Sequence, residues 1–437
     1  MKDHINIGII GLGTVGTGTL RILRDNAELI RRRVGAPIEV TKIAVRNIHA
    51  DRGITVDPAL LTTNASAVVE NPDIDVVVEL IGGEEPAKTL ILAAIARGKH
   101  VVTANKALLA THGPAIHMAA RTAGVSVGFE ASVAGGIPVI KTLKEALAAN
   151  RILSIYGIIN GTSNYILTKM TDEGRSFSDV LAEAQRAGYA EADPAFDVGG
   201  IDTAHKLAIL VNLAFDAEAP LKDIFTEGIT AITPLDIDFG RTLGYKVKLL
   251  AIAKMHDGKV EARVHPTMVP DTYPIAKVGG VYNAIQIVGD ACQDIMLYGR
   301  GAGALPTGSA VVADIMDIAK QILEGGAAIS SRPRAAALAL RRPPLQPMHS
   351  VTSLYYLRLM ALDQPGVLSQ ISGILGQHRI SIAQMIQRGR KEGGSVPLVI
   401  MTHTAIESDI QQALVEIKAL SCVTEEPALI RVEGDEP

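Results

Sequence analysis

Short apolar runs alternate with amphipathic stretches over the first 130 residues of the chain. The predicted strands are Ile5–Ile10, Ile38–Val45, Ile74–Leu80 and His100–Thr103, and the predicted helices are Thr14–Arg33 and Ala87–Arg97. Continuous Val and Ile runs are typical of strands that are buried on both faces of a parallel sheet. The repeated order of strand, helix and strand predicts a doubly wound α/β domain over residues 1–130.

The pattern is mixed between residues 131 and 330, where strands such as Val260–Val264 and Ala284–Val288 are interspersed with helices. We expect an α+β domain there that carries substrate binding, catalysis and dimerisation. Residues 305–325 are expected to return to the first domain. Residues 331–349 are rich in proline and arginine and predict a linker, because proline blocks both helix and ladder hydrogen bonds.

The last part of the chain, residues 350–437, has the predicted order βαββαβ. Its predicted strands are Leu354–Leu362, Ile380–Gln387, Val396–His403 and Ala428–Val432, and its predicted helices are Val367–His378 and Ser408–Leu420. The sequence therefore predicts a third, compact domain after the linker.

Composition excludes several classes of partner. The 42 basic and 46 acidic residues nearly cancel, so a net charge of −4 gives no general attraction to nucleic acid or to anionic membranes. No apolar run reaches the roughly 20 residues that a membrane span needs, and the N-terminus shows no signal peptide. The two cysteines, Cys292 and Cys422, are isolated, as in a reducing compartment. We expect a cytoplasmic protein.

The first loop contains a GxGxxG sequence, Gly11–Gly16, directly after a predicted strand and at the start of a helix. In that context Gly11 permits a tight turn, Gly13 lets the backbone approach a pyrophosphate, and Gly16 allows close helix–sheet packing. The helix N-terminus supplies free N–H groups and partial positive charge. The predicted cofactor-binding residues of this Rossmann-type loop are Gly11, Gly13, Thr14, Val15 and Gly16.

The end of the second predicted strand bears on cofactor choice. An acidic residue there binds the ribose 2′-hydroxyl of NAD, but this chain has Arg46 instead. Arginine can pair with a 2′-phosphate, so NADP is the expected cofactor, with NAD also possible. A solvated surface arginine is the alternative interpretation.

Two polar segments point to catalysis. Thr103 and Lys106 follow a predicted parallel strand, at the sheet edge where ligands collect. Lys106 can hold a carboxylate or a cofactor amide there, or it can be an ordinary solvated lysine at a helix start. The second segment carries four carboxylates within twelve positions, Glu191, Asp193, Asp197 and Asp202. Their spacing does not match a calcium-binding EF-hand loop.

Asp202 and Lys206 are four residues apart at the start of a predicted helix. An exposed pair of this kind would contribute only about 0.3–0.5 kcal/mol. The following residues Leu207–Phe215 are apolar almost all round, which predicts a buried helix. A lysine that enters the core needs a carboxylate partner, and such a lysine near a cleft is a reasonable proton donor to a carbonyl oxygen.

The chain resembles the homoserine dehydrogenase family over essentially its whole length. The motifs that carry the resemblance are GLGTVG at 11–16, TANK at 103–106, NGTSNYI at 160–166, GYAEADPAFDVGGIDTAHKLAIL at 188–210 and GRGAGALPTGSAVVADI at 299–315. Asp363–Leu368 (DQPGVL), at the start of the βαββαβ module, resembles an ACT domain. The resemblance implies NAD(P)-linked interconversion of L-aspartate 4-semialdehyde and L-homoserine, on the route to threonine and methionine.

The resemblance also implies roles for single residues. Lys206 is the expected general acid/base and Asp202 is its partner. Glu191 and Asp197 are expected to bind the substrate ammonium, Thr162 to contact substrate through its backbone, and Lys106 to hold the reacting region. Further expected cofactor neighbours are Arg46, Thr103, Lys106, Gly188 and Gly303.

A turn in the family binds a monovalent cation, which is expected to be sodium. Its implied ligands here are the backbone carbonyls of Glu130, Val133, Gly135 and Ile137. The ACT domain implies an amino-acid effector, for which threonine is expected, and a homodimer or homotetramer. Its Gln364–Leu368 turn leads into a helix N-terminus, which suits a carboxylate.

Two alternatives remain from the residues themselves. A dehydrogenase for another small amino-acid aldehyde would need the same site. A non-catalytic sensor of nucleotide and amino acid would not need Lys206, Asp202 and Glu191. A purely dimerising role is the alternative for the C-terminal domain.

Overall fold

The computed structural model describes residues 2–325, 342–389 and 394–434. Its chain divides into two compact units, each of which is described by itself. The first unit comprises Met1–Ile152, His205–Leu221 and Gly289–Pro343, and the second comprises Leu153–Ala204, Lys222–Val288 and Pro344–Pro437. Each unit is assembled from three separate parts of the chain.

The first unit contains a parallel sheet with the strand order β3-β2-β1-β4-β5-β6. Its strands are β1 (Ile5–Ile10), β2 (Ile38–Ala44), β3 (Leu61–Thr62), β4 (Val76–Glu79), β5 (His100–Thr103) and β6 (Val127–Gly128). Strand β12 (Gln293–Arg300) belongs to the same unit but not to this sheet. The order reverses at β1, where ligands of open α/β sheets bind beyond the carboxyl ends of the strands. The predicted doubly wound sheet is confirmed.

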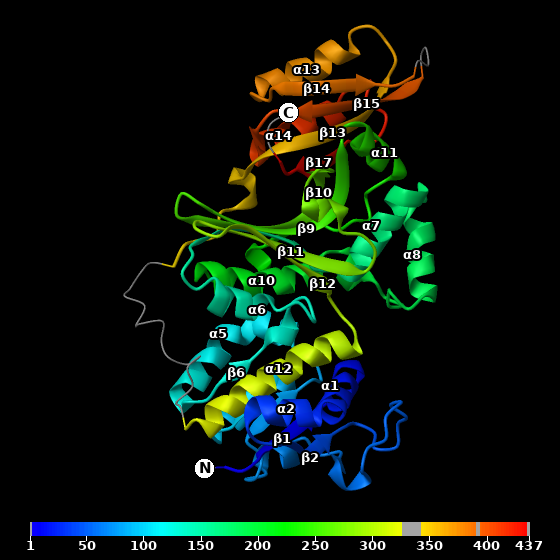
Figure 1. The fold of residues 1–437 in the computed structure, drawn as a ribbon. Helices are drawn as coiled ribbons and strands as arrows, with labels where there is room; N and C mark the ends of the chain where they lie inside the picture. The colour runs from blue at the N-terminus through cyan, green and yellow to red at the C-terminus, as the bar shows by residue number, and fades with distance from the viewer. Residues whose placement is uncertain (1, 326–341, 390–393, 435–437) are drawn as a thin grey trace. The chain divides into compact units, whose positions relative to one another are not determined.

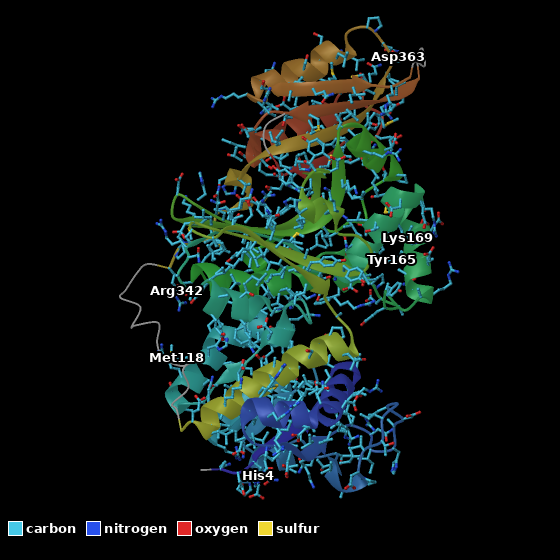
Figure 2. All side chains as sticks on the ribbon, in the orientation of Figure 1. His4, Met118, Tyr165, Lys169, Arg342 and Asp363 are labelled. Carbon is cyan, nitrogen blue, oxygen red and sulfur yellow. The ribbon has the colours of Figure 1, made fainter. Side chains whose placement is uncertain are left out.

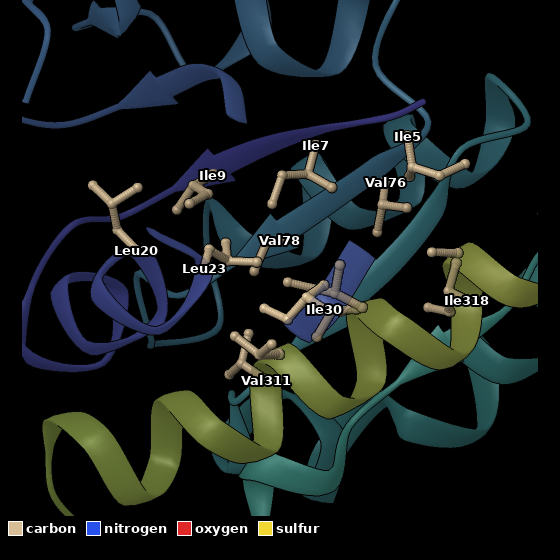
Figure 3. Packing of buried hydrophobic residues seen from close by; sticks show 14 of the residues in the cluster. Ile5, Ile7, Ile9, Leu20, Leu23, Ile30, Val76, Val78, Val311 and Ile318 are labelled. Atoms are coloured by element: carbon tan, nitrogen blue, oxygen red, sulfur yellow. The ribbon is translucent and has the colours of Figure 1, made fainter. Parts of the chain in front are cut away.

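Helices cover this sheet and bury its apolar strands. They are α1 (Thr14–Asp25), α2 (Ala27–Val34), α3 (Ser66–Glu70), α4 (Ala87–Ala96), α5 (Lys106–Ala123), α6 (Val139–Lys141) and α12 (Ala304–Leu323). Figure 3 shows Ile7 and Val78 of the strands facing Val311 and Ile318 of α12, and all four are buried.

Helix α12 returns to the N-terminal part of the chain through an unusually close contact with α1. A Cβ atom added at Gly18 would lie 1.9 Å from the carbonyl oxygen of Ala304, and one added at Gly308 would lie 2.7 Å from the backbone nitrogen of Thr19. Only glycine at both positions lets the two backbones approach this closely. The predicted single helix from Thr14 to Arg33 is wrong, because the chain breaks at Asn26, which ends α1 and precedes α2.

The second unit contains a mixed sheet with the strand order β11-β7-β9-β10-β17-β13-β15-β14. Its strands are β7 (Ile152–Ile158), β8 (Phe225–Thr226), β9 (Tyr245–His256), β10 (Lys259–Pro270), β11 (Tyr282–Gly289), β13 (Thr352–Leu362), β14 (Ile382–Gln387), β15 (Ser395–Thr402), β16 (Ala405–Ile406) and β17 (Ala428–Val432). The expected strand Val260–Val264 is the start of the longer β10, which continues through Pro266 opposite Leu249 of β9.

The helices of the second unit are α7 (Gly161–Glu173), α8 (Phe177–Arg186), α9 (Ala195–Val198), α11 (Pro234–Thr242), α13 (Val367–Gln377) and α14 (Glu407–Lys418). Tyr165 and Lys169, which Figure 2 labels on α7, lie one turn apart. The Tyr165 hydroxyl donates to Glu183 of α8 at 2.7 Å, so the two helices are joined by side chains as well as by packing. Helix α10 (Ile201–Phe215) begins in the second unit and continues into the first.

The C-terminal βαββαβ module is confirmed, with α13 and α14 beside its four main strands (Figure 1). Its last strand, β17, pairs in parallel with β10, with Arg431 opposite Thr267. The module therefore extends the sheet of the preceding domain, a connection that no sequence pattern indicated.

Most of the predicted linker, residues 331–341, lies outside the described residues. The rest of it is tied to β10, because Val260 exchanges backbone hydrogen bonds with Pro344 and Gln346 at 2.9 and 2.7 Å. None of the helices in the described part of the chain is long and apolar enough to cross a lipid bilayer.

Candidate active site

The glycine-rich turn after β1 has the geometry that its sequence predicts. Gly11 has a φ of +102°, and a Cβ atom there would lie 2.7 Å from the carbonyl oxygen of Leu80. A Cβ at Gly16 would lie 2.3 Å from the carbonyl oxygen of Gly11, whereas one at Gly13 meets nothing within 4 Å. Gly11 and Gly16 thus hold the turn closed, and Gly13 leaves its backbone open to a ligand.

Helix α1 begins immediately after this turn, and Gly13 offers no side-chain cap. No side chain from Gly13 therefore caps the N–H groups of the first turn, and these groups can bind an anion. Thr14 is exposed and Val15 is half-buried at that end. Arg46 is exposed two residues beyond Ala44, whose carbonyl accepts the Gly11 N–H at 2.9 Å. This backbone hydrogen bond fixes the end of β2 beside the glycine-rich turn.

A buried carboxylate organises the ends of β4 and β5. Glu79 is fully buried, and it accepts hydrogen bonds from the Thr103 hydroxyl at 2.6 Å and from the Ile81 N–H at 2.8 Å. Asn105 caps α5 and donates to the Gly83 carbonyl at 2.6 Å, which leaves Lys106 half-buried at the first position of that helix. Sequence reasoning missed Glu79 and Asn105; a polar residue that ends an apolar strand was the available signal for Glu79.

Several of the residues that were expected to bind substrate lie near the N-terminus of α7 in the second unit. The Thr162 hydroxyl donates to the Tyr189 carbonyl at 2.7 Å, and the Ser163 hydroxyl donates to the Asp197 carbonyl at 3.0 Å. The Asn160 amide donates to Asp197 at 2.7 Å and to Asp202 at 2.9 Å. These contacts hold Asp197 and Asp202 beside one another. Asn160 was not among the predicted site residues, although it lies in the quoted NGTSNYI motif.

Helix α10 carries Asp202 and Lys206 one turn apart, and both are buried, with exposures of 3% and 8%. Leu207, Leu210 and Val211 of the same helix are fully buried, so the prediction of a buried helix is confirmed. A buried lysine keeps its charge only with compensating polar groups. A buried lysine that lies near a cleft is a candidate proton donor.

The remaining residues of the acidic segment, which runs from Glu191 to Asp202, differ in their surroundings. Glu191 is exposed and Asp197 is half-buried. Asp193 accepts the Ala195 N–H at 3.1 Å, so it orders the start of α9. Gly188 has a φ of +74°, with open space where a Cβ would lie, and Gly303 has a φ of +124° at the start of α12.

The turn that was expected to hold a cation is tight and buried. Its four implied ligands, Glu130, Val133, Gly135 and Ile137, lie within eight consecutive positions. Gly135 has a φ of +56°, and a Cβ there would lie 2.5 Å from the carbonyl oxygen of Gly301. Neutral carbonyl oxygens are ligands that hard cations accept, and one of the implied four, that of Ile137, accepts the Val139 N–H at 2.8 Å. In the described part of the chain, no three His, Cys, Asp or Glu side chains cluster as metal ligands would.

A buried carboxylate pair supports this turn. The Asp314 carboxylate accepts the Glu130 N–H at 2.8 Å, and the Glu130 carboxylate accepts the N–H groups of Ile140 and Lys141, each at 2.8 Å. Burial raises the pKa of Asp314 to about 7. Sequence reasoning missed Asp314, because nothing in the pattern of α12 distinguishes it from a solvated residue.

A doubly wound sheet with an open glycine turn is typical of dinucleotide-binding proteins, and a buried lysine one turn from a buried carboxylate fits the proton transfer of an oxidoreductase. Three family models match the chain: "Homoserine dehydrogenase, NAD binding domain" over residues 11–130, "Homoserine dehydrogenase" over 138–316 and "ACT domain" over 355–422. The chain belongs to the homoserine dehydrogenase family and carries an ACT domain, as the sequence motifs indicated.

Individual relatives agree with these family models. The homoserine dehydrogenase of Pseudomonas aeruginosa is 48% identical over 98% of this chain and 99% of its own. That of Helicobacter pylori is 42% identical over 99% and 100%. The crystal structure of a homoserine dehydrogenase from Thiobacillus denitrificans superposes with a TM-score of 0.91 at 48% identity, covering 98% of both chains.

A more distant structure bears on the cofactor. A hyperthermophilic archaeal homoserine dehydrogenase in complex with NADPH has a TM-score of 0.61 at 26% identity, over 72% of this chain and 97% of its own.

Proposed function

We propose that this protein interconverts L-aspartate 4-semialdehyde and L-homoserine, with NADP as the preferred cofactor and NAD as a possible substitute. The observation that carries the proposal is the buried Lys206, one turn after the buried Asp202 on α10. Membership of the homoserine dehydrogenase family names the substrate class. Residues of the glycine-rich turn, with Thr103, Gly188 and Gly303, would hold the cofactor.

The nicotinamide, when bound, supplies the hydride that reaches the aldehyde carbon. Negative charge then develops on the aldehyde oxygen, and the Lys206 ammonium stabilises and protonates that oxygen. In the reverse direction Lys206 takes the proton from the homoserine hydroxyl. Asp202 compensates the lysine charge and holds its position.

The substrate carries its own ammonium and carboxylate, which need opposite charges nearby. Glu191 and Asp197 would bind the ammonium, Lys106 the carboxylate, and the backbone at Thr162 would complete the pocket. The half-buried Asp197, whose position is fixed by Asn160 and Ser163, suits this role better than a free surface carboxylate would.

Arg46 supports the preference for NADP, because an exposed guanidinium beside the glycine turn can pair with a 2′-phosphate. The NADPH complex of the archaeal relative agrees with this choice. The backbone carbonyls of Glu130, Val133, Gly135 and Ile137 would bind sodium, which would order the turn between β6 and α6.

The ACT domain would bind an amino-acid effector, for which we propose threonine, and so place the enzyme under feedback control on the route to threonine and methionine. Gly366, with a φ of +91°, starts α13 and leaves its N-terminus without a side-chain cap, which suits a carboxylate. We also propose a homodimer or homotetramer. Strand β14 ends the sheet order, and its Met385 is 45% exposed, as a pairing edge would be.

One assay tests the activity: oxidation of NADPH with L-aspartate 4-semialdehyde, with and without threonine. Turnover with this aldehyde and not with glutamate 5-semialdehyde supports the proposed substrate. The reverse preference would point to a dehydrogenase for another amino-acid aldehyde, and no turnover with either would leave a nucleotide and amino-acid sensor.

A further inference from the structure

The side chain of Asn160 lies between the two carboxylates that the proposed chemistry uses. Its Nδ2 atom donates to Asp197 Oδ1 at 2.7 Å and to Asp202 Oδ2 at 2.9 Å. A primary amide has two N–H donors on one nitrogen, so both donors are used on these carboxylates. Asn160 is 6% exposed, and little water competes for these hydrogen bonds.

The orientation of the amide is fixed by its other atom. The Oδ1 atom of Asn160 accepts the N–H of Ser163 at 2.8 Å and so caps helix α7. Turning the amide over would place its oxygen against two carboxylates and its nitrogen against an N–H group. Both contacts would be repulsive, so the helix cap and the carboxylate contacts support the same rotamer.

The same end of α7 holds the backbone of the acidic segment. The Ser163 hydroxyl binds the Asp197 carbonyl at 3.0 Å, and the Thr162 hydroxyl binds the Tyr189 carbonyl at 2.7 Å. The backbone contacts fix the segment between Tyr189 and Asp197, but Asn160 fixes the carboxylate groups themselves. It is the residue in this motif whose side chain touches both Asp197 and Asp202.

We propose that Asn160 is a positioning residue, which sets the separation of the Asp197 and Asp202 carboxylates so that one meets the substrate ammonium and the other serves Lys206. This inference rests on the proposed function. Two carboxylates that share a site repel each other, and a neutral double donor between them offsets that repulsion without neutralising either. No other uncharged side chain of this size offers two donors on one atom together with an acceptor for a helix N-terminus.

Two substitutions separate this role from the helix cap. Asp and Ser are both good N-cap residues, so Asn160→Asp and Asn160→Ser keep an acceptor for the Ser163 N–H. The aspartate loses both donors and adds a third carboxylate, whereas the serine replaces the two amide donors with a single hydroxyl donor on a shorter side chain. The control is Ser176→Ala, which removes the cap of α8, where the Ser176 hydroxyl accepts the Asp179 N–H at 3.2 Å without contacting the acidic segment.

The measurements are KM and kcat for L-homoserine, KM for NADP and the melting temperature of the full-length enzyme. We expect Asn160→Ser to raise KM for homoserine about tenfold, and Asn160→Asp about a hundredfold, as for hydrogen bonds to charged groups. The KM for NADP should change less than about twofold, because the nucleotide turn is untouched. Ser176→Ala should lower the melting temperature and leave both KM values unchanged.

Unchanged homoserine kinetics in a folded Asn160→Ser variant would overturn the proposal, and so would a loss of melting temperature without a change in KM, as in the control. If the wild-type enzyme turns over neither L-homoserine nor L-aspartate 4-semialdehyde, the proposed function fails and the inference fails with it. A wild type that is active with an unaffected Asn160→Ser variant refutes the inference alone.

Discussion

Arg431 of the ACT domain donates a hydrogen bond to Glu227 of the preceding domain at 2.8 Å. The same guanidinium binds both carboxylate oxygens of Glu407 at the start of α14, and it is 1% exposed. Two residues after Glu227, the Ile229 N–H donates to the Val198 carbonyl at 2.9 Å. Val198 lies between Asp197 and Asp202, so a short series of contacts joins the ACT domain to the segment that carries these two carboxylates.

This connection predicts that Glu227 affects the response to threonine. Glu227→Gln keeps the shape of the side chain but weakens its pairing with Arg431, and the Glu227 side chain is 38% exposed. We expect threonine to inhibit this variant at least threefold less strongly than the wild type. Allosteric coupling between two sites typically amounts to about 1–3 kcal/mol in total, and the Arg431 contact would carry part of it. Inhibition is measured as the change in apparent KM for homoserine across a threonine titration.

The matched control is Glu426→Gln. Glu426 and Glu227 line the same cavity of about 400 Å³, but Glu426 pairs with Lys418 and is mostly exposed. Equal loss of threonine inhibition in both variants would show that the cavity charge matters rather than the Arg431 contact. Unaltered inhibition in Glu227→Gln would remove this contact from the coupling.

Glu433 is expected to be essential for stability. It binds Arg263, which is 1% exposed, and Lys254 at 2.8 Å. Burial raises the pKa of Glu433, but the two cations outweigh burial and hold that pKa below its usual value. Glu433→Ala removes the carboxylate partner of Lys254 and leaves Arg263 with Glu261 as its remaining carboxylate partner. Breaking a buried ion pair typically costs about 3–5 kcal/mol. Thermal or urea unfolding measures this loss, and Glu425→Ala, at an exposed position, is the control.

The Glu433 contacts also bear on truncation of the ACT domain. A chain that ends near residue 347 would lose both Glu433 and the β17 strand that pairs with β10. We expect such a chain to unfold at a lower temperature, so its threonine response would not isolate the effector site. A truncated chain as stable as the wild type would contradict this expectation.

Lys206→Ala should lower kcat by at least a thousandfold, because the developing charge on the aldehyde oxygen would lose its proton donor. Binding of NADPH, followed by fluorescence titration, should remain within about twofold. Lys222→Ala, at an exposed lysine beyond the end of α10, should leave both quantities unchanged. Turnover close to that of the wild type in the Lys206 variant would end the proton-donor assignment.

Arg46→Ala should raise KM for NADP about tenfold or more and leave KM for NAD within twofold, because only NADP has a 2′-phosphate to pair with the guanidinium. The control is Arg32→Ala, an exposed arginine on α2. Equal effects on both cofactors, or none, would assign Arg46 to the solvated surface.

His117 is expected to make stability depend on pH. Burial, followed by the charge of Lys144, lowers the pKa of His117 to about 4, from an ordinary value of 6.5. Between these values the unfolded chain binds a proton that the folded chain does not, so the free energy of unfolding falls as pH drops from 6.5 to 4. Each pKa unit corresponds to about 1.4 kcal/mol.

The test compares urea unfolding of the wild type and of His117→Phe at pH 7 and at pH 4.5. The phenylalanine variant should lose less stability between the two pH values. His256→Phe, at a histidine whose side chain is 73% exposed, should retain the wild-type dependence. An identical loss in the wild type and in His117→Phe would show that His117 does not titrate in this range.

Local sequence patterns predicted most of the individual elements. β1, β5 and β17 have the bounds that the sequence indicated, because the apolar residues at the centre of each strand are buried in a sheet. The burial of α10 also followed from its composition. The break at Asn26 was missed because the residues on both sides form helix equally well, and Asn26 alone departs from helical angles, with a φ of −108° and a ψ of 17°.

The sequence by itself determined the glycine-rich turn, the C-terminal βαββαβ module and the spacing of Asp202 and Lys206 on one buried helix. Each of these features depends on the residue types and their spacing within one continuous segment, which do not depend on how distant segments pack. Tertiary structure alone decided that Asn160 binds Asp197 and Asp202, and that Arg431 binds Glu227. Such contacts join residues tens to hundreds of positions apart, and their existence depends on how the sheets and helices pack rather than on any local pattern.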